Sequence, residues 1–264
     1  MQDSLQDKVA LLTGGTSGIG LAVAQQLAAR GVRLVLAGRN SQQGQQAAQA
    51  LGDPTKALFV QSDVSRENQV AALVQRTLAQ YGQLDFVFNN AGAEGTPGPL
   101  TETTEEGIEE LLATNVKGTL LVLKHVLPPL LAQGSGIIVN TASYIGTVMP
   151  FPVAMPYGAT KAAVLSITRA LAAGYAKDHL QFFAVCPWTT DSPMIDRLVE
   201  GQADQEAAKA NFATVNPSGK LATPADIARA VVALFAGESD LPNGEAVLVD
   251  SGSVTSQIQP MSFQ

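Results

Sequence analysis

Short apolar runs that alternate with stretches of helical period are the feature of this sequence that most limits its fold. The runs are rich in Val, Leu and Phe, and the segments between them carry apolar residues at helical spacing. Strands that are buried on both faces are apolar at nearly every position, so this order is typical of a parallel sheet with helices on both sides. We therefore predict an α/β fold with a doubly wound, seven-stranded parallel sheet.

The expected elements follow from this alternation. The expected strands are 9–12, 33–37, 57–61, 84–89, 136–140, 180–186 and 246–249, and the expected helices are 19–30, 41–51, 67–81, 104–131, 156–177 and 224–235. Between 188 and 221 the alternation fails over a stretch too long for an ordinary connection, which favours a substrate loop. No linker or repeat interrupts the pattern, and we predict that 1–264 form one domain.

Charge and composition exclude several classes of function. The net charge of −7 leaves no basic stripe for nucleic acid and no polybasic segment for a membrane. Residues 1–8 lack the apolar core of a signal peptide, and no apolar run approaches the roughly 20 residues that span a bilayer, so we expect a cytoplasmic protein. Cys186, His125 and His179 have no metal-ligand spacing, and Cys186 ends an apolar run, which favours a buried small side chain.

A glycine-rich segment, Thr13–Gly20, follows the first expected strand and runs into a helix. Glycines bring bare backbone against a pyrophosphate, and the helix N-terminus offers unpaired N–H groups, so we predict a dinucleotide site. Its expected contacts are Gly14, Thr16, Ser17, Gly18, Ile19 and Gly20. The spacing G-x-x-x-G-x-G departs from the common G-x-G-x-x-G, and a tight strand-to-helix turn without a ligand is the alternative.

The end of the second strand predicts which dinucleotide binds. The strand ends in Gly38 and Arg39, with no carboxylate to hold the ribose hydroxyls of NAD. Arg39 is placed to pair with the 2′-phosphate of NADP, so we predict a preference for NADP(H). If Arg39 is only a solvated surface side chain, NAD(H) is the alternative.

Tyr157 and Lys161 lie four residues apart in an expected helix and therefore share one face. A neighbouring ammonium favours the phenolate, which would lower the pKa of Tyr157 from about 10 and suit it to acid/base catalysis. Tyr-x-x-x-Lys also occurs by chance, and a pair of surface neighbours is the alternative.

Further residues stand at matching places along the chain. Asn89-Asn90-Ala91-Gly92 follows the fourth expected strand, Asn115 lies in the next helix, and Ser143 follows the fifth strand. With Thr13–Gly20 and Tyr157-Gly158-Ala159-Thr160-Lys161, they make the chain resemble the short-chain dehydrogenase/reductase family from about residue 7 to 252. The resemblance implies a Rossmann-like sheet, a nicotinamide cofactor and a homotetramer.

The resemblance also implies roles for individual residues. Tyr157 would exchange the substrate proton, Ser143 would bind the carbonyl oxygen, Lys161 would hold the nicotinamide ribose and tune Tyr157, and Asn115 would hold a water that links Lys161 to solvent. For Ser143, a hydroxyl bonded to local backbone is the alternative. Besides the glycine-rich segment and Arg39, the implied cofactor contacts are Asp63 and Val64 near the adenine, Asn90, Ala91, Gly92, Tyr157, Lys161, Pro187 and Thr190.

The chain departs from the family pattern near the expected substrate. Trp188 follows Pro187 where the family usually has glycine, and we predict that Ser143, Tyr157 and Trp188 line the substrate pocket. A tryptophan packed in the core is the alternative for Trp188, because indole buries much apolar area. Ser143 and Tyr157 are also one residue further apart than is typical, and the last strand ends in Asp250-Ser251-Gly252 instead of two glycines.

These observations predict an NAD(P)-dependent oxidoreductase that moves a hydride between the cofactor and a small carbonyl or alcohol substrate. An enoyl reductase or a dehydratase/epimerase of the same fold fits the Ser, Tyr and Lys set less well. The alternative from another class is a catalytically silent dinucleotide-sensing protein, for which loss of the tyrosine or lysine would be expected. A purely structural protein would not need a complete acid/base set.

Overall fold

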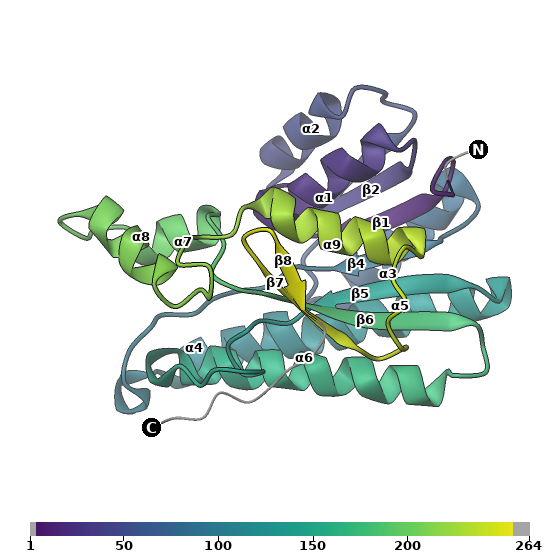
Figure 1. Ribbon diagram of the computed structural model, residues 1–264. Coiled ribbons are helices and arrows are strands. Elements are labelled where there is room, and N and C mark those ends of the chain that lie inside the picture. The colour runs from purple at the N-terminus through teal and green to yellow at the C-terminus, as the bar shows by residue number, and fades with distance from the viewer. Residues whose placement is uncertain (1–3, 256–264) are drawn as a thin grey trace.

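One sheet runs through the computed structural model of the chain, which describes residues 4–255 (Figure 1). In this part of the chain it has eight strands in the order β3-β2-β1-β4-β5-β6-β7-β8. They are β1 Val9–Thr13, β2 Arg33–Gly38, β3 Ala57–Gln61, β4 Phe86–Asn89, β5 Gly136–Thr141, β6 Leu180–Pro187, β7 Ala246–Asp250 and β8 Ser253–Thr255. The predicted doubly wound parallel sheet is confirmed, because β1 to β7 pair in parallel throughout.

The predicted strand number was one too low. β8 pairs antiparallel with β7 after a turn at Gly252, whose φ is +77°. All three of its residues are exposed, so it carries none of the apolar pattern by which the other strands are found.

Helices cover the sheet on both faces (Figure 1). The helices of residues 4–255 are α1 Gly18–Ala29, α2 Ser41–Ala50, α3 Glu67–Tyr81, η1 Leu100–Glu102, α4 Glu105–Leu111, η2 Leu112–Lys117, α5 Gly118–Gln133, η3 Pro152–Ala154, α6 Met155–Gly174, α7 Pro193–Val199, α8 Gln205–Ala213 and α9 Pro224–Ala236. α1, α2 and α9 pack on one face and α3, α5 and α6 on the other, as two buried clusters show. Alternate β1 residues supply both, with Leu12 in the first cluster and Leu11 in the second.

The order of the strands reverses between β1 and β4, which lie side by side in the sheet. In an open α/β sheet, ligands bind beyond the carboxyl ends of the strands at such a reversal. Thr13, the last residue of β1, is paired in register with Asn89, the last residue of β4. The glycine-rich segment and the Asn-Asn-Ala-Gly segment therefore leave the sheet together.

The helix predicted over 104–131 is not continuous. It begins after Thr104, whose side chain accepts a hydrogen bond from the backbone N–H of Gly107, but residues Leu112–Lys117 form the π-helix η2 between α4 and α5. A π-helix widens the turn and often lies at a functional site. Asn115 lies in this widened turn and is buried.

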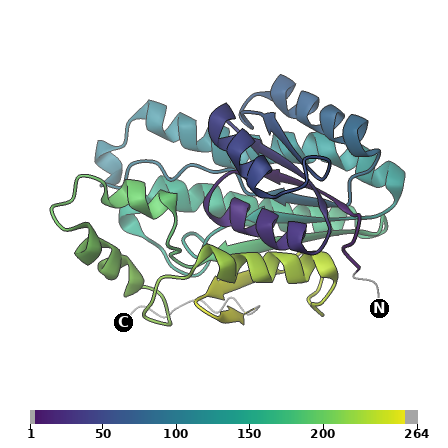
Figure 2. The same cartoon turned by 90° about the horizontal axis from the view of Figure 1, so that it is seen from above.

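The stretch 188–221, predicted as an irregular loop, contains α7 and α8. Both helices project beyond the end of the sheet (Figures 1 and 2). The base of this segment is fixed by Asn216, which donates to the backbone oxygens of Thr189 at 2.9 Å and Lys220 at 2.8 Å and to Asp250 Oδ1 at 3.2 Å. That the whole chain is one domain stays a prediction. Among residues 4–255, no helix is long and apolar enough to cross a membrane.

Candidate active site

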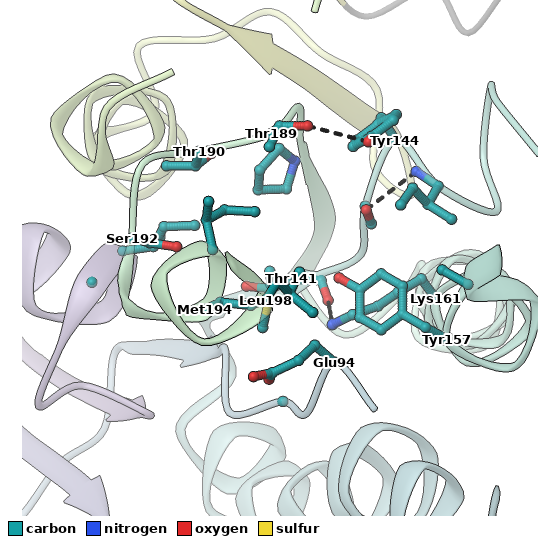
Figure 3. Close-up of a pocket in the computed structure, with 18 of the residues that line it drawn as sticks. Glu94, Thr141, Tyr144, Tyr157, Lys161, Thr189, Thr190, Ser192, Met194 and Leu198 are labelled. Carbon is teal, nitrogen blue, oxygen red and sulfur yellow. Dashed lines mark hydrogen bonds between the residues drawn. The ribbon is translucent and has the colours of Figure 1, made fainter. Parts of the chain in front are cut away.

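A cavity of about 400 Å³ opens where β1, β4, β5 and β6 end and where α7 approaches them. Figure 3 shows side chains from these elements facing one space. The predicted site residues that line it are Gly14, Ser17, Gly18, Ile19, Asn90, Ala91, Gly92, Ser143, Tyr157, Lys161, Pro187, Trp188 and Thr190. Thr16, Gly20, Arg39, Asp63, Val64 and Asn115 are not part of its lining.

The glycine-rich turn forms a bare backbone cradle at one side of the cavity. Gly14 and Gly18 have φ values of +63° and +49°, which residues other than glycine rarely adopt. At Gly20 a Cβ would lie 2.1 Å from the carbonyl oxygen of Gly14, so only glycine fits there. The turn leads directly into the N-terminus of the 12-residue α1, and these residues fit the pyrophosphate of a dinucleotide.

Thr13 joins the glycine turn to the segment after β4. Its Oγ1 accepts hydrogen bonds from the backbone N–H groups of Asn90 at 3.0 Å and Ala91 at 3.1 Å. In return, Asn90 Nδ2 donates to the backbone oxygens of Thr13 and Gly14, both at 3.3 Å. Asn90 therefore shapes the turn whatever contact it makes with a cofactor.

Tyr157 and Ser143 face each other in the cavity, although they come from α6 and from the loop after β5. Burial raises the pKa of Tyr157 to about 12, and a hydrogen bond with Ser143 opposes this shift. Ser143 Oγ also accepts from the backbone N–H of Ile145 at 3.2 Å, so the local interaction considered for Ser143 is present as well. The two hydroxyl groups together can hold one substrate oxygen.

Lys161 lies beneath Tyr157 and is buried. Its Nζ donates to the backbone oxygen of Thr141 at 2.9 Å and lies 5.6 Å from the centroid of the Tyr157 ring (Figure 3). Burial lowers the pKa of Lys161 to about 8. The predicted lowering of the Tyr157 pKa by this ammonium is wrong for this structure, because the amine lies over the ring and burial of the phenol dominates.

Asn115 connects the segment after β4 to α6 through hydrogen bonds. Its Oδ1 accepts from the backbone N–H of Ala93 at 2.8 Å, while its Nδ2 donates to the Ala93 oxygen and to Thr160 Oγ1, both at 2.9 Å. Thr160 Oγ1 donates in turn to the backbone oxygen of Tyr157 at 2.7 Å. At Gly92, a Cβ would lie 3.3 Å from Asn115 Oδ1 and 3.4 Å from Lys161 Nζ, so glycine keeps the space between them open. The water that the family resemblance implies there stays a prediction.

The predicted adenosine side lies outside the cavity. Arg39 follows β2 and is exposed, and its positive charge helps to lower the pKa of Asp63. Burial opposes ionisation of Asp63, but hydrogen bonds from Ser65 and the charges of Arg39 and Arg66 hold its pKa below the ordinary value. Val64 is buried against Gly118, where a Cβ would lie 2.8 Å from its methyl group.

Trp188 combines the two alternatives considered from the sequence. It is 7% exposed, belongs to a buried cluster and also lines the cavity. Its ring stacks on Tyr144 with centroids 4.5 Å apart and planes 16° apart. Thr189 Oγ1 donates to the Tyr144 hydroxyl at 3.2 Å (Figure 3), which fixes the stack to the start of the segment 188–221.

Several lining residues carry no sequence signal. Arg197 of α7 donates from Nε to Glu94 Oε1 at 2.5 Å and from Nη2 to Glu94 Oε2 at 3.1 Å. These two residues are 103 positions apart, so no local pattern pairs them. The other lining residues not predicted from the sequence are Pro97, Thr141, Ala142, Tyr144, Ile145, Phe151, Val153, Ala154, Thr189, Ser192, Pro193, Met194, Ile195, Leu198 and Phe212.

Metal-ligating side chains do not gather at this site. Among residues 4–255, no group of three or more His, Cys, Asp or Glu is placed to hold a metal ion. Cys186 is buried in the same cluster as Trp188, as its apolar run predicted, and burial raises its pKa to about 12.

Comparison with known proteins agrees with the fold. The family model described as "Enoyl-(Acyl carrier protein) reductase" matches residues 14–254. The chain is 34% identical over 249 residues to 2-(R)-hydroxypropyl-CoM dehydrogenase of Xanthobacter autotrophicus, covering 92% of this chain and 97% of that protein. It is 35% identical over 253 residues to cis-4-hydroxycyclohexanecarboxylate dehydrogenase of Sinomonas cyclohexanicum, covering 96% and 98%.

Solved structures resemble it over nearly the whole chain. The crystal structure of levodione reductase has a TM-score of 0.88 at 32% identity and covers 94% of this chain and 97% of that one. The 3-ketoacyl-(acyl-carrier-protein) reductase from Brucella melitensis, complexed with NADH, has a TM-score of 0.86 at 31% identity and covers 94% and 99%.

Proposed function

Because the chain belongs to the short-chain dehydrogenase/reductase family, we propose that it works at neutral pH as an NADP(H)-preferring carbonyl reductase. It is a nicotinamide-dependent oxidoreductase that transfers a hydride between the cofactor and a carbonyl or alcohol carbon. The direction, the preference for NADP(H) and the residue roles below are the proposal. The relatives named above are all dehydrogenases or reductases, which gives no support to a catalytically silent protein.

One observation carries the proposal: the hydroxyl-bearing side chains of Tyr157 and Ser143 line the same cavity as the glycine turn, and Ser143 acts on the pKa of Tyr157. Two hydroxyl groups at one point suit a carbonyl or alcohol oxygen, which both donates and accepts hydrogen bonds in the course of the reaction. An enoyl substrate would take the hydride at its β-carbon, two bonds away from the carbon whose oxygen the hydroxyl groups hold. The hydroxyl pair therefore favours carbonyl reduction over the activity in the family description.

The protonation state of Tyr157 supports the direction of the reaction, since a phenol keeps its proton at neutral pH both at its ordinary pKa of about 10 and at the raised value. A phenol with a pKa of about 12 keeps its proton at neutral pH and is in the form needed to donate it to a carbonyl oxygen. Ser143 orients that oxygen, and Lys161, fixed by the Thr141 oxygen, holds the ring of Tyr157 in place. When bound, the reduced nicotinamide supplies the hydride.

The preference for NADP(H) rests on Arg39. This exposed cation follows β2 directly, and the chain there offers no carboxylate of the kind that holds the ribose of NAD. Asp63 forms an ion pair with Arg66 at 3.7 Å, and the charge of Arg39 also helps to lower the pKa of Asp63. A 2′-phosphate would meet the Arg39 guanidinium through charge-assisted hydrogen bonds.

Replacement of Tyr157 by Phe tests the proposed reaction. Loss of a general acid lowers turnover by about 10²–10⁴-fold, while binding of reduced cofactor should change little. Tyr175→Phe is the matched control, because Tyr175 packs near Phe182, outside the cavity, with ring centroids 6.1 Å apart. Ketone reduction by Tyr157→Phe at the rate of the control would contradict the proposal.

Neither assembly nor location is settled by the fold. We propose a homotetramer, and support comes from the family resemblance and from the exposed Leu112 and Leu120 at 47% and 48%. Mass measurement by light scattering tests this, and a monomer at micromolar concentration would contradict it.

Location in the cytoplasm stays a prediction, which cell fractionation tests.

A further inference from the structure

The pair formed by Glu94 and Arg197 lies in the wall of the substrate cavity. Glu94 comes from the segment after β4, five residues beyond Asn89, and Arg197 comes from α7 of the substrate loop. Two hydrogen bonds join the guanidinium to both carboxylate oxygens. The Glu94 side chain is only 17% exposed, whereas that of Arg197 is 54% exposed.

The surroundings of this pair are apolar. Apart from Glu94 and Arg197, the only charged side chain among the described lining residues is Lys161, which is bound to the Thr141 oxygen. The apolar side chains of the lining include Met194 and Leu198 of α7, together with Phe151, Val153 and Phe212. A ligand in this cavity therefore meets one guanidinium, and Glu94 already occupies it.

Glu94 also faces the reacting groups. Figure 3 shows its side chain on the same side of the cavity as Tyr157. After burial, which is the largest cause, the charges around Tyr157, that of Glu94 among them, contribute to its raised pKa. A substrate whose oxygen lies at Tyr157 thus has a fixed carboxylate nearby.

We propose that Glu94 is a specificity-determining residue that occupies Arg197 and restricts the cavity to uncharged ketones and alcohols. This inference rests on the proposed function, and it names the substrate class of that same site. A substrate carboxylate would have to displace Glu94 from the Nε and Nη2 edge of Arg197 or bind the remaining side of the guanidinium, and in either position it would lie beside a second negative charge. Like charges in a partly buried site repel, and the two Glu94 oxygens already take the Nε and Nη2 edge of the guanidinium, which leaves only its Nη1 side for a second carboxylate.

Removal of the Glu94 charge should therefore release Arg197 for an anionic substrate. The test compares reduction of cyclohexanone with reduction of 4-oxocyclohexanecarboxylate, which differ by one carboxylate. In the wild type, kcat/KM should be higher for cyclohexanone. In Glu94→Gln the ratio of the two values should shift toward the carboxylate by roughly ten- to a hundredfold, the size of a charge-assisted hydrogen bond.

Asp196→Asn is the matched control. Asp196 is the neighbour of Arg197 on α7, pairs with Lys209 at 2.5 Å and does not line the cavity, so the same change of carboxylate to amide leaves Arg197 occupied. Its substrate ratio should equal that of the wild type. In the double variant Glu94→Gln with Arg197→Met, the gain for the carboxylate should disappear.

Binding gives a second readout that needs no turnover. Trp188 is the only tryptophan of the chain and lines the cavity, so its fluorescence reports a bound ketone. With oxidised cofactor at saturation, the two ketones bind without reacting. Across the wild type, Glu94→Gln, Asp196→Asn and the double variant, the ratio of the two Kd values should change in the same way as the ratio of the two kcat/KM values.

The two readouts separate the inference from the proposed function. If no ketone is reduced but Trp188 fluorescence shows the expected charge preference and its loss in Glu94→Gln, the proposed reaction fails and the inference stands. If cyclohexanone is reduced but Glu94→Gln leaves both ratios unchanged, the inference fails and the reaction stands. Tighter binding of 4-oxocyclohexanecarboxylate than of cyclohexanone by the wild type, or binding of neither, would also overturn the inference.

Discussion

Trp188 and Tyr144 stack face to face between the substrate cavity and the core, with 4.5 Å between ring centroids. Tyr144 directly follows Ser143, so the stack connects the residue after β6 with the loop that carries a proposed catalytic hydroxyl. Trp188 donates its backbone N–H to the Val249 oxygen at 2.9 Å, which fixes the main chain at Trp188 relative to β7. The indole is therefore both a structural and a pocket residue.

Replacement of Trp188 by Gly should affect stability and selectivity together. Loss of a buried indole costs about 3–5 kcal/mol in the free energy of unfolding, and the space released should raise kcat/KM for bulky ketones relative to small ones. The stacked pair Phe86 and Phe235, with centroids 4.9 Å apart, lies away from the cavity and offers the control Phe235→Ala. That variant should lose stability without a change in the substrate ratio. A Trp188→Gly enzyme with an unchanged ratio would show that the indole serves only the core.

Burial of Lys161 predicts how stability depends on pH. Its pKa is about 8 in the folded protein and 10.5 in an unperturbed lysine, so the unfolded chain binds more protons between these values. The cost of burying the ammonium is therefore fully present below pH 8 and disappears as the pH rises toward 10.5. The wild type should gain stability over this window relative to Lys161→Met.

Denaturant unfolding at several pH values measures this difference. The exposed Lys177, just beyond α6, gives the control Lys177→Met, because its ammonium is in water before and after unfolding. A gap between Lys161→Met and the wild type that stays constant from pH 8 to 10.5 would mean that Lys161 is charged throughout.

The strands and the catalytic residues were predictable from the sequence because their signals are local. β2 lies within one residue of its expected range and β3 matches it, since each is a short apolar run that ends in polar residues. Ser143, Tyr157 and Lys161 were found through spacing and family resemblance, and they do meet in one cavity. The apolar runs and the motifs can be recognised from the sequence because each is made of residues that lie close together along the chain.

Other features depend on contacts between distant segments. Residues 112–117 continue the apolar pattern of the helices beside them, so nothing in that pattern reveals η2. α7 has seven residues, too few for a clear helical period. The direction of the Tyr157 pKa shift was predicted wrongly because burial from every side, rather than the residue four positions away, decides it.

The preference for NADP(H) predicts a selective effect of Arg39. Loss of a charge-assisted contact should weaken NADP(H) binding by about ten- to a hundredfold in Arg39→Ala and leave NAD(H) nearly unchanged. Arg33→Ala is a matched control, because Arg33 begins the same strand at the opposite end and faces Asp7 at 3.6 Å. Titration of both cofactors against each variant gives the four affinities, and a native preference for NAD(H) would refute the role of Arg39.

A substitution at Gly146 tests whether turnover depends on the position of Ser143 relative to Tyr157. It lies in the tight loop between them, has a φ of +81°, and a Cβ on it would lie 2.1 Å from the backbone oxygen of Gly158. Alanine at this position must push the Ser143 loop away from α6, since backbone atoms on both sides cannot yield as a flexible side chain can.

A shift of about 1 Å between reacting groups can lower turnover by about 10²-fold, so Gly146→Ala should lose kcat while cofactor affinity is retained. Gly174→Ala, at the end of α6 where a Cβ meets no atom within 4 Å, is the control and should keep both activity and stability. Steady-state kinetics with a cofactor titration separates the two effects. Full turnover by Gly146→Ala would mean that the Ser143 loop is positioned by contacts other than its packing on Gly158.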